Sequence, residues 1–195
     1  MGPASAADVL RKGLAMGADS AVHVLDNSLE GADLAWTAQV LAAAITQAGY
    51  DLVVAGNEST DGRGGVIPAM IAELLGVPHL TYLNTIEISS DAVSGERETE
   101  YGTLTAHATL PAVVSVTERA PEPRFPGFKG IMQAKKKPLT VVALADLGTG
   151  SASSSAASVV LATSSRPARS AGTKIVDTGD AGEQLADFLA TGRLI

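Results

Sequence analysis

A glycine-rich polar turn is the part of this chain best suited to hold a ligand. It lies within DLVVAGNESTDGRGGVIPAMIAELLG, residues 51–76, between an apolar segment and an amphipathic one. Gly62, Gly64 and Gly65 carry no Cβ, so the backbone there can approach a ligand closely. In an open α/β sheet, a turn of this kind offers N–H groups and a positive helix end to phosphates. The stretch therefore predicts a phosphate-binding turn.

Two alternatives for this turn stay open on the residues alone. Thr60 and Asp61 are residue types that cap helices, so we expect the following helix to begin near Gly64. The turn matches neither the GxxxxGK[ST] pattern nor the GxGxxG pattern, so it is not a P-loop or a dinucleotide fingerprint. It is either a phosphate site or a plain loop between a strand and a helix.

Other residues that could do chemistry are scattered along the chain. The three histidines are far apart, which favours packing over catalysis or metal binding: His23, His79 and His107. Three glutamates alternate with other residues, as on one solvated face of a strand: Glu96, Glu98 and Glu100. The chain has no cysteine, which excludes disulfides and thiolate metal sites. We find no Ser–His–Asp set or carboxylate pair, so we expect no catalytic residues of its own.

Strands and helices alternate in the first half of the chain, which is typical of a parallel sheet with flanking helices. Ser5 is a possible N-cap of the first helix, and Trp36 falls on an Ala-rich helix with its side chain expected in the core. The expected elements are a helix over 4–17, a strand over 21–25, a helix over 32–48, a buried strand over 51–55 and a helix over 64–75.

The second half changes character. We expect hairpin turns near Ser89-Ser90-Asp91 and Tyr101-Gly102. Further expected elements are a strand over 111–116, a short helix over 129–136, a strand over 139–144 and a terminal helix over 182–191. That helix has Leu185, Phe188 and Leu189 on one face, after the Ser-rich linker SASSSAAS. We divide the chain into an α/β domain over 1–146 and a C-terminal arm over 147–195.

Composition narrows the class of protein. The net charge is −7 and 46% of the 195 residues are hydrophobic, which suits a folded acidic protein and argues against nucleic acid as a general partner. No apolar run is long enough to cross a bilayer, and the first residues lack the order of a signal peptide. We expect a cytoplasmic protein with no direct membrane insertion.

Three segments together resemble the β subunit of electron transfer flavoprotein, the FixA type. They are GPASAADVLRKGLAMGAD (2–19), DLVVAGNESTDGRGG (51–65) and LPAVVSVTERAPEPRFPGFKGIMQAKKKPLTV (110–141), and the tail SRPARSAGTKI adds to the likeness. The resemblance covers essentially all residues. It implies a Rossmann-like adenine-nucleotide-binding domain, a structural AMP, and FAD held mainly by an α subunit. It also implies an electron carrier, not an enzyme, that serves fatty acid oxidation.

The resemblance assigns roles to individual residues. The family's AMP loop matches Gly56, Asn57, Glu58, Ser59, Thr60, Asp61, Gly62, Arg63, Gly64, Gly65, Val66 and Ile67, and Ala6 falls at a further AMP-lining position. The loop that the family uses to recognise acyl-CoA dehydrogenases matches Pro123–Lys137, with Phe128 as the apolar anchor and Ile131, Met132, Lys135 and Lys136 beside it. Lys137 would add to that basic surface, whereas Gln133 stands where some members have lysine. Packing of Phe128 under its own loop, with solvated lysines, is the alternative.

The resemblance also sets the partners and the rivals. The arm after Asp146 matches the segment that embraces the α subunit, and the electrons would pass to a quinone oxidoreductase. The family has a further N-terminal strand and helix, and we expect that this chain lacks them. The other readings are a stand-alone nucleotide-binding module of the universal-stress type, which needs no docking arm, and an ATP pyrophosphatase, which would need a lysine or carboxylate pair in the turn.

Overall fold

The computed structural model describes residues 1–148, 156–158 and 160–195. The chain forms two compact units, Met1–Leu161 and Ala162–Ile195. Each unit is described by itself below. Part of the Ser-rich linker expected from the sequence lies outside the described residues.

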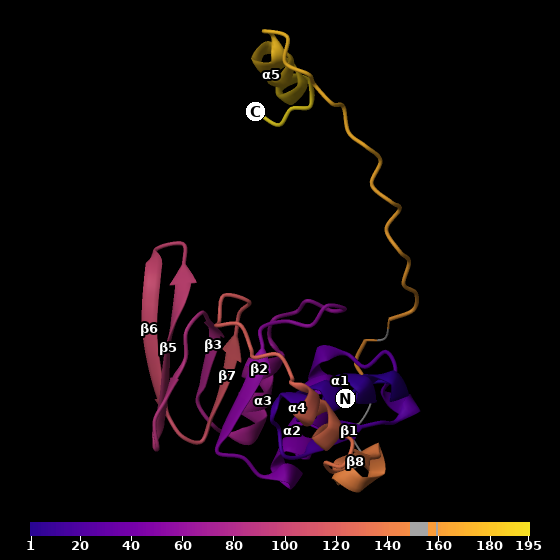
Figure 1. The fold of residues 1–195 in the computed structure, drawn as a ribbon, viewed down its shortest axis with the longest axis vertical. Coiled ribbons are helices and arrows are strands. Elements are labelled where there is room, and N and C mark those ends of the chain that lie inside the picture. Colours follow the sequence, from indigo (N-terminus) through magenta and orange to yellow (C-terminus); the bar gives the residue numbers. More distant parts are fainter. Residues whose placement is uncertain (149–155, 159) are drawn as a thin grey trace. The chain divides into compact units, whose positions relative to one another are not determined.

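Parallel strands form the centre of the first unit (Figure 1). Strand β7 (Ala112–Val116) pairs in parallel with β2 (Leu52–Gly56) on one side and with β3 (His79–Leu83) on the other. A second parallel pair joins β1 (Ala21–Val24) to β8 (Leu139–Val142). Parallel strands need crossover connections, which are usually helices. These pairings therefore confirm the predicted α/β class.

Two helices cover one face of the β2–β7–β3 sheet. Helix α2 spans Leu34–Ala48 and helix α3 spans Ile67–Leu75. They bury Ala38, Ile71 and Ala72 against Val113 of β7. Because alternate residues of a strand point to opposite faces, Val54 of β2 lies on the other face, where it is 55% exposed. The strand expected to be buried is therefore exposed on that face at Val54, whereas Leu52 of the same face packs against the cluster that contains Val114.

Helix α2 also packs toward the β1–β8 pair. Trp36 and Val40 share a second core cluster with Val24 of β1 and with Leu29 of the short 3-10 turn η2 (Asn27–Leu29). The 3-10 turn η3 (Leu144–Leu147) contributes two further leucines to the same cluster. The prediction that Trp36 lies in the core is confirmed, and one helix thus contributes to two apolar clusters.

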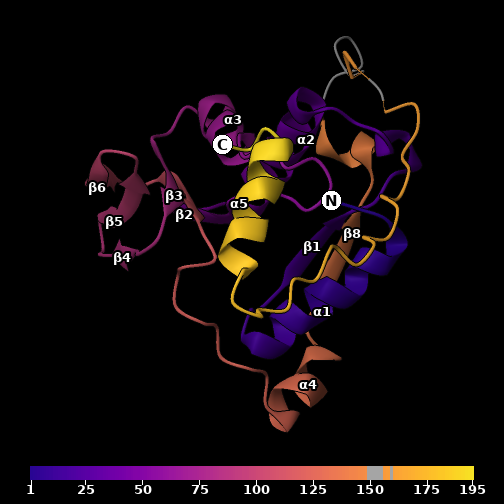
Figure 2. The same ribbon diagram turned by 90° about the horizontal axis from the view of Figure 1, so that it is seen from above.

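An antiparallel sheet stands beside β3, as Figures 1 and 2 show. It consists of β4 (Glu87–Ile88), β5 (Ala92–Thr99) and β6 (Gly102–Thr109), and the two predicted hairpin turns are confirmed. Glu96 and Glu98 are exposed on this hairpin, as expected for a solvated face. Val93 and Ala108 from this sheet pack with Leu83 and Val114 of the parallel one.

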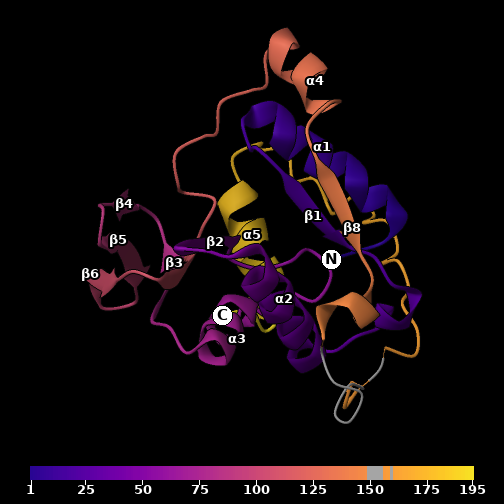
Figure 3. The ribbon, with the colours of Figure 1, turned by 90° about the horizontal axis from the view of Figure 1, so that it is seen from below.

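Helix α1 (Ala7–Met16) and the short helix α4 (Phe128–Ala134) lie next to each other near the β1–β8 pair (Figure 3). The 3-10 turn η1 (Ala4–Ala6) leads into α1, and Gly17 ends it. The predicted N-cap at Ser5 is wrong, because Ser5 lies inside that turn and no side chain caps either helix start.

The second unit contains helix α5 (Ala181–Thr191), where the sequence predicts it. Leu185 and Phe188 are both more than half exposed. Residues 160–177 carry no helix or strand. Among all described residues, no helix is long and apolar enough to cross a membrane.

Candidate functional site

The glycine-rich turn connects β2 to α3 at the carboxyl edge of the sheet. Gly56 ends β2, and α3 begins only at Ile67, with Pro68 in its first turn. The expectation that Thr60 and Asp61 cap this helix and that it starts at Gly64 is wrong, because Val66 is its N-cap and no side chain caps it. A proline is favoured in the first turn because its missing N–H would be unpaired there anyway. Residues 57–66 are therefore a loop.

Some N–H groups of the loop already donate to acceptors within the loop. The Gly62 N–H donates to Asp61 Oδ1 over 2.7 Å, and the Arg63 N–H donates to the Ser59 carbonyl over 3.1 Å. The Ser59 hydroxyl and the Gly62 N–H hold the pKa of Asp61 below its usual range. The Asp61 carboxylate thus stays charged at neutral pH and takes the place of an external anion at the Gly62 N–H.

Two of the three glycines meet protein instead of open space. A Cβ on Gly65 would lie 2.3 Å from the Tyr82 hydroxyl, and Gly65 has a positive φ of 64°. A Cβ on Gly64 would lie 3.2 Å from Leu34. Only at Gly62 is the nearest atom, Ser59 Oγ, as far as 3.8 Å. Close packing therefore accounts for Gly64 and Gly65, and Gly62 is the open position.

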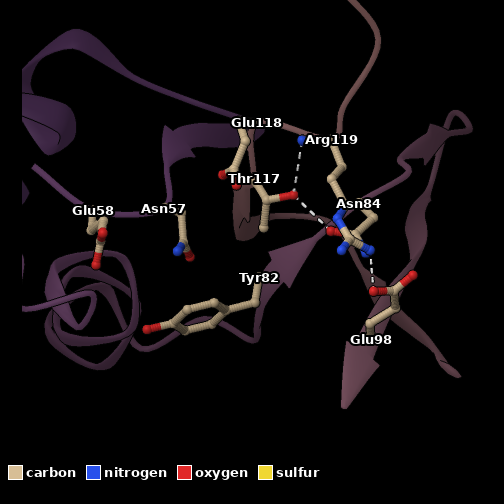
Figure 4. A pocket seen from close by; sticks show the side chains of 8 residues that line it. All are labelled: Asn57, Glu58, Tyr82, Asn84, Glu98, Thr117, Glu118 and Arg119. Carbon is tan, nitrogen blue, oxygen red and sulfur yellow. Dashed lines mark hydrogen bonds and ion pairs between the residues drawn. The ribbon is translucent and has the colours of Figure 1, made fainter. Parts of the chain in front are cut away.

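A polar pocket of about 270 Å³ adjoins the loop at the ends of β2, β3 and β7 (Figure 4). Two contacts link residues that line the pocket. The Thr117 hydroxyl donates to Asn84 Oδ1 over 2.6 Å, and Arg119 forms an ion pair with Glu98. The lining residues are Asn57, Glu58, Tyr82, Asn84, Glu98, Thr117, Glu118 and Arg119. The lining holds three carboxylates and one guanidinium, that of Arg119. Glu98 pairs with Arg119, and Glu58 pairs with Arg63 of the loop over 3.1 Å. Because carboxylates outnumber guanidinium groups in the lining, the pocket suits hydroxyl and amide groups better than an anion.

One buried polar atom of the pocket has no partner. Asn57 Oδ1 is shielded from solvent without a hydrogen bond. An unpaired buried acceptor costs free energy, roughly 1–3 kcal/mol, so a donor from a ligand would stabilise it. This unpaired acceptor is the feature of the site that most directly indicates a bound ligand.

The structure brings together only part of the residue set predicted from the sequence. Asn57 and Glu58 reach the pocket, whereas Ala6 lies at the start of α1, beside Gly2. Sequence reasoning missed Tyr82, Asn84, Thr117 and Arg119. A signal for two of them was present, because Asn84 and Thr117 are polar residues that directly follow β3 and β7.

Tyr82 enters the site through an irregularity in β3. The register between β3 and β7 shifts between Leu80 and Leu83, and Tyr82 has a positive φ of 61°. The Ser115 hydroxyl accepts the displaced Tyr82 N–H over 3.0 Å. The bulge directs the Tyr82 ring toward the glycine loop, where its hydroxyl comes within 3.4 Å of the Gly65 carbonyl. No sequence pattern signals this bulge.

The expected partner-recognition residues form an exposed apolar surface on α4. Phe128 is 81% exposed, and Ile131 and Met132 are about half exposed. Lys135 and Lys136 are exposed beside them. Lys137 differs, because its Nζ donates to carbonyls of the α1 end. A further aromatic, Phe125, is 90% exposed in the segment before α4.

Comparison with known proteins shows the family of this chain. A family model described as electron transfer flavoprotein domain matches residues 1–147. The chain is 50% identical over 198 residues to the electron transfer flavoprotein subunit beta of Mycobacterium tuberculosis H37Rv, covering all of this chain and 74% of that protein. It is 51% identical over 200 residues to that of Mycobacterium leprae, with the same coverage of both chains. With the subunit beta of Megasphaera elsdenii it shares 37% identity over 144 residues, 70% of this chain and 53% of that protein. The chain belongs to the electron transfer flavoprotein family, and within that family it is similar to the β subunits.

Proposed function

We propose that this chain pairs with an electron transfer flavoprotein α subunit and carries electrons from acyl-CoA dehydrogenases and similar flavin dehydrogenases to a quinone oxidoreductase. The observation that carries the proposal is the 50% identity across the whole chain to proteins named as β subunits. FAD, held mainly by the α subunit, supplies the redox chemistry when bound. The part of this chain is to bind a nucleotide and to dock partners, without catalytic residues of its own.

AMP is the nucleotide that we assign to the glycine loop, residues 56–67. The residues present fit a nucleoside monophosphate in two respects. Asn57 Oδ1 offers a buried, unpaired acceptor to an amino or hydroxyl group. Gly62 offers an N–H whose present acceptor, Asp61 Oδ1, a phosphate oxygen would replace. The role of Ala6 in lining the same nucleotide stays part of this proposal.

Dehydrogenase recognition is the role that we assign to α4. An exposed aromatic surrounded by apolar and basic side chains matches the make-up of an interface hot spot. Phe128 would be the anchor, Ile131 and Met132 its apolar border, and Lys135 and Lys136 the charges that speed encounter with acidic partners. The proposed role in fatty acid oxidation depends on this surface, because the surface would bind the acyl-CoA dehydrogenases.

Docking on the α subunit is the role that we assign to the C-terminal arm, residues 147–195. Leu185 and Phe188 of α5 are exposed, and their burial on a partner would be favourable. A stand-alone nucleotide-binding module of the universal-stress type would have no use for such an arm. That module is the alternative that the following experiment separates from the carrier.

The test is co-expression with the α subunit of the same organism, followed by size exclusion chromatography. Absorbance at flavin wavelengths and nucleotide analysis of the peak are measured together. We expect a yellow heterodimer that contains AMP. A colourless monomer that retains AMP would support the stand-alone module instead, and a colourless monomer without any nucleotide would contradict both the carrier role and the AMP site.

A further inference from the structure

Helices α1 and α4 are joined by basic side chains that donate to each other's terminal carbonyls. Arg11 of α1 donates through Nη1 to the Ala134 carbonyl over 2.7 Å and to the Lys137 carbonyl over 2.8 Å, at the end of α4. The last four carbonyls of a helix lack partners within the helix and form the negative end of its dipole. A guanidinium is therefore well matched to that position.

The reverse contact comes from the segment that carries α4. Lys137 donates through Nζ to the Leu14 carbonyl over 3.1 Å and to the Ala18 carbonyl over 2.6 Å, at the end of α1. Arg124, before α4, donates through Nε to the Met16 carbonyl over 3.1 Å. Both ends of the 124–137 segment are thus fastened to the same helix end.

The two helix backbones also approach closely. A Cβ on Gly130 of α4 would lie 2.5 Å from the Ala15 carbonyl oxygen of α1. Any side chain at this position would push α4 away from α1. The hydrogen bonds of Arg11 and Lys137 are formed across this close contact.

Helix α4 depends on such contacts for its existence. It has seven residues, and no side chain caps its start at Gly127. An isolated helix of this length is unstable in water. Among its residues only Ala134 is buried, whereas Phe128, Ile131 and Met132 are about half exposed or more, and Ile131 borders a cavity that residues of α1 also line. The stabilising contacts described for α4 therefore lie mainly on its α1 side.

We propose that Arg11 and Lys137 are positioning residues for partner recognition, which hold α4 on α1 so that Phe128, Ile131 and Met132 are presented as one fixed surface. The inference rests on the proposed role of α4 in docking dehydrogenases. It assigns to Lys137 a task different from that of its neighbours Lys135 and Lys136, and it gives α1 a part in recognition without a contact to the partner.

The experiment compares Arg11→Met, Arg11→Lys and wild type, each as the heterodimer with the α subunit. Hydrogen–deuterium exchange of residues 131–134 measures the opening of α4, because the N–H groups before Ile131 have no acceptor within the helix. We expect Arg11→Met to raise that exchange rate at least about tenfold, the change expected when a hydrogen bond to a charged group is lost. Arg11→Lys, which lacks the planar fork of arginine, should fall between the two.

Partner recognition is measured with a purified acyl-CoA dehydrogenase and the heterodimer as its electron acceptor. For Arg11→Met we expect KM for the heterodimer to rise about tenfold, with flavin content and kcat unchanged. Lys12→Met is the matched control, since it removes one positive charge from the adjacent, exposed position of α1. Lys137→Met should reproduce the effect of Arg11→Met from the other side of the contact.

Two results would overturn the inference: unchanged exchange of α4 in Arg11→Met, or a KM that stays constant although the exchange has increased. If Arg11→Met does not assemble, Arg11→Lys and Lys137→Met still decide between these outcomes. Failure of the proposed function is separate and visible in wild type, as an absence of any reaction with the dehydrogenase. The inference would fall with it, whatever the exchange of α4 shows.

Discussion

Phe128 is the first residue of α4, and its side chain is highly exposed. Its side chain is 81% exposed, so its replacement removes little packing from the isolated chain. We predict that Phe128→Ala weakens binding to an acyl-CoA dehydrogenase by at least ~2 kcal/mol, as for a hot-spot aromatic. The thermal midpoint should stay within about 1 °C, since exposed substitutions change stability little. Titration calorimetry and thermal unfolding measure the two quantities.

Phe125→Ala supplies the matched control for that prediction. Phe125 is 90% exposed and lies three residues away, outside α4. If its loss weakens binding as much as the loss of Phe128, then the anchor role does not belong to Phe128 alone. An unchanged affinity in Phe128→Ala would remove the role altogether.

Gly65 shows what residue types alone leave undetermined. In sequence its lack of a Cβ suggests room for a ligand, but in the structure the Tyr82 hydroxyl fills that room. Tyr82 reaches the loop only because β3 is irregular between Leu80 and Leu83. The position of the candidate loop was predictable from the apolar run before it, whereas the reason for this glycine depends on a strand bulge that local sequence does not encode.

At the scale of elements, the antiparallel hairpin is fitted to the parallel sheet through Gly95 of β5. A Cβ at this position would lie 2.3 Å from the Thr85 carbonyl oxygen and 2.9 Å from Leu83. We predict that Gly95→Ala lowers the free energy of unfolding by about 1–3 kcal/mol, the usual cost of overpacking. Urea denaturation followed by circular dichroism measures it.

Ser94→Ala is the comparison for Gly95→Ala. Ser94 is the preceding residue of β5 and is only half-buried. Its side chain points to the opposite face of the strand, so this change should have a small effect. Equal losses in both variants would mean that the close contact at Gly95 does not determine the stability of the hairpin.

The types of the helices and strands were largely predictable from the sequence. The start of α3 differs from the prediction, although the sequence contains a signal for it. Alternating apolar segments give the parallel strands, and Gly17, Gly49 and Gly76 mark helix ends as the structure has them. The capping residue types Thr60 and Asp61 predict a start of α3 near Gly64, three residues before the observed start at Ile67, which Pro68 signals. The exposure of Val54 could not be predicted, since an apolar strand residue does not reveal which of its faces is covered.

The whole molecule divides into a packed unit and a segment with few internal contacts of its own. We predict that a chain ending at Leu161 unfolds at the same temperature as the full chain, because the three core clusters lie within Met1–Leu161. The same chain should lose the α subunit in a pull-down, because it lacks the apolar residues of α5. Differential scanning calorimetry and co-purification measure the two effects.

Retention of the α subunit by the shortened chain would contradict the docking role of the arm. Leu185→Ser with Phe188→Ser in the full chain gives a milder form of the same comparison. Both side chains are exposed, so any loss of assembly would come from the interface and not from the fold.

The sole tryptophan of the chain lies in a core cluster, and this placement makes it an optical probe. Trp36 packs with Val24 and Val40, and its backbone N–H is held by Asp33 at the start of α2. Its emission therefore reports the cluster of α2 and β1 alone, with no second indole to confuse the signal. A flavin absorbs where tryptophan emits, so quenching of this one emitter would register arrival of a loaded α subunit in real time, without any label.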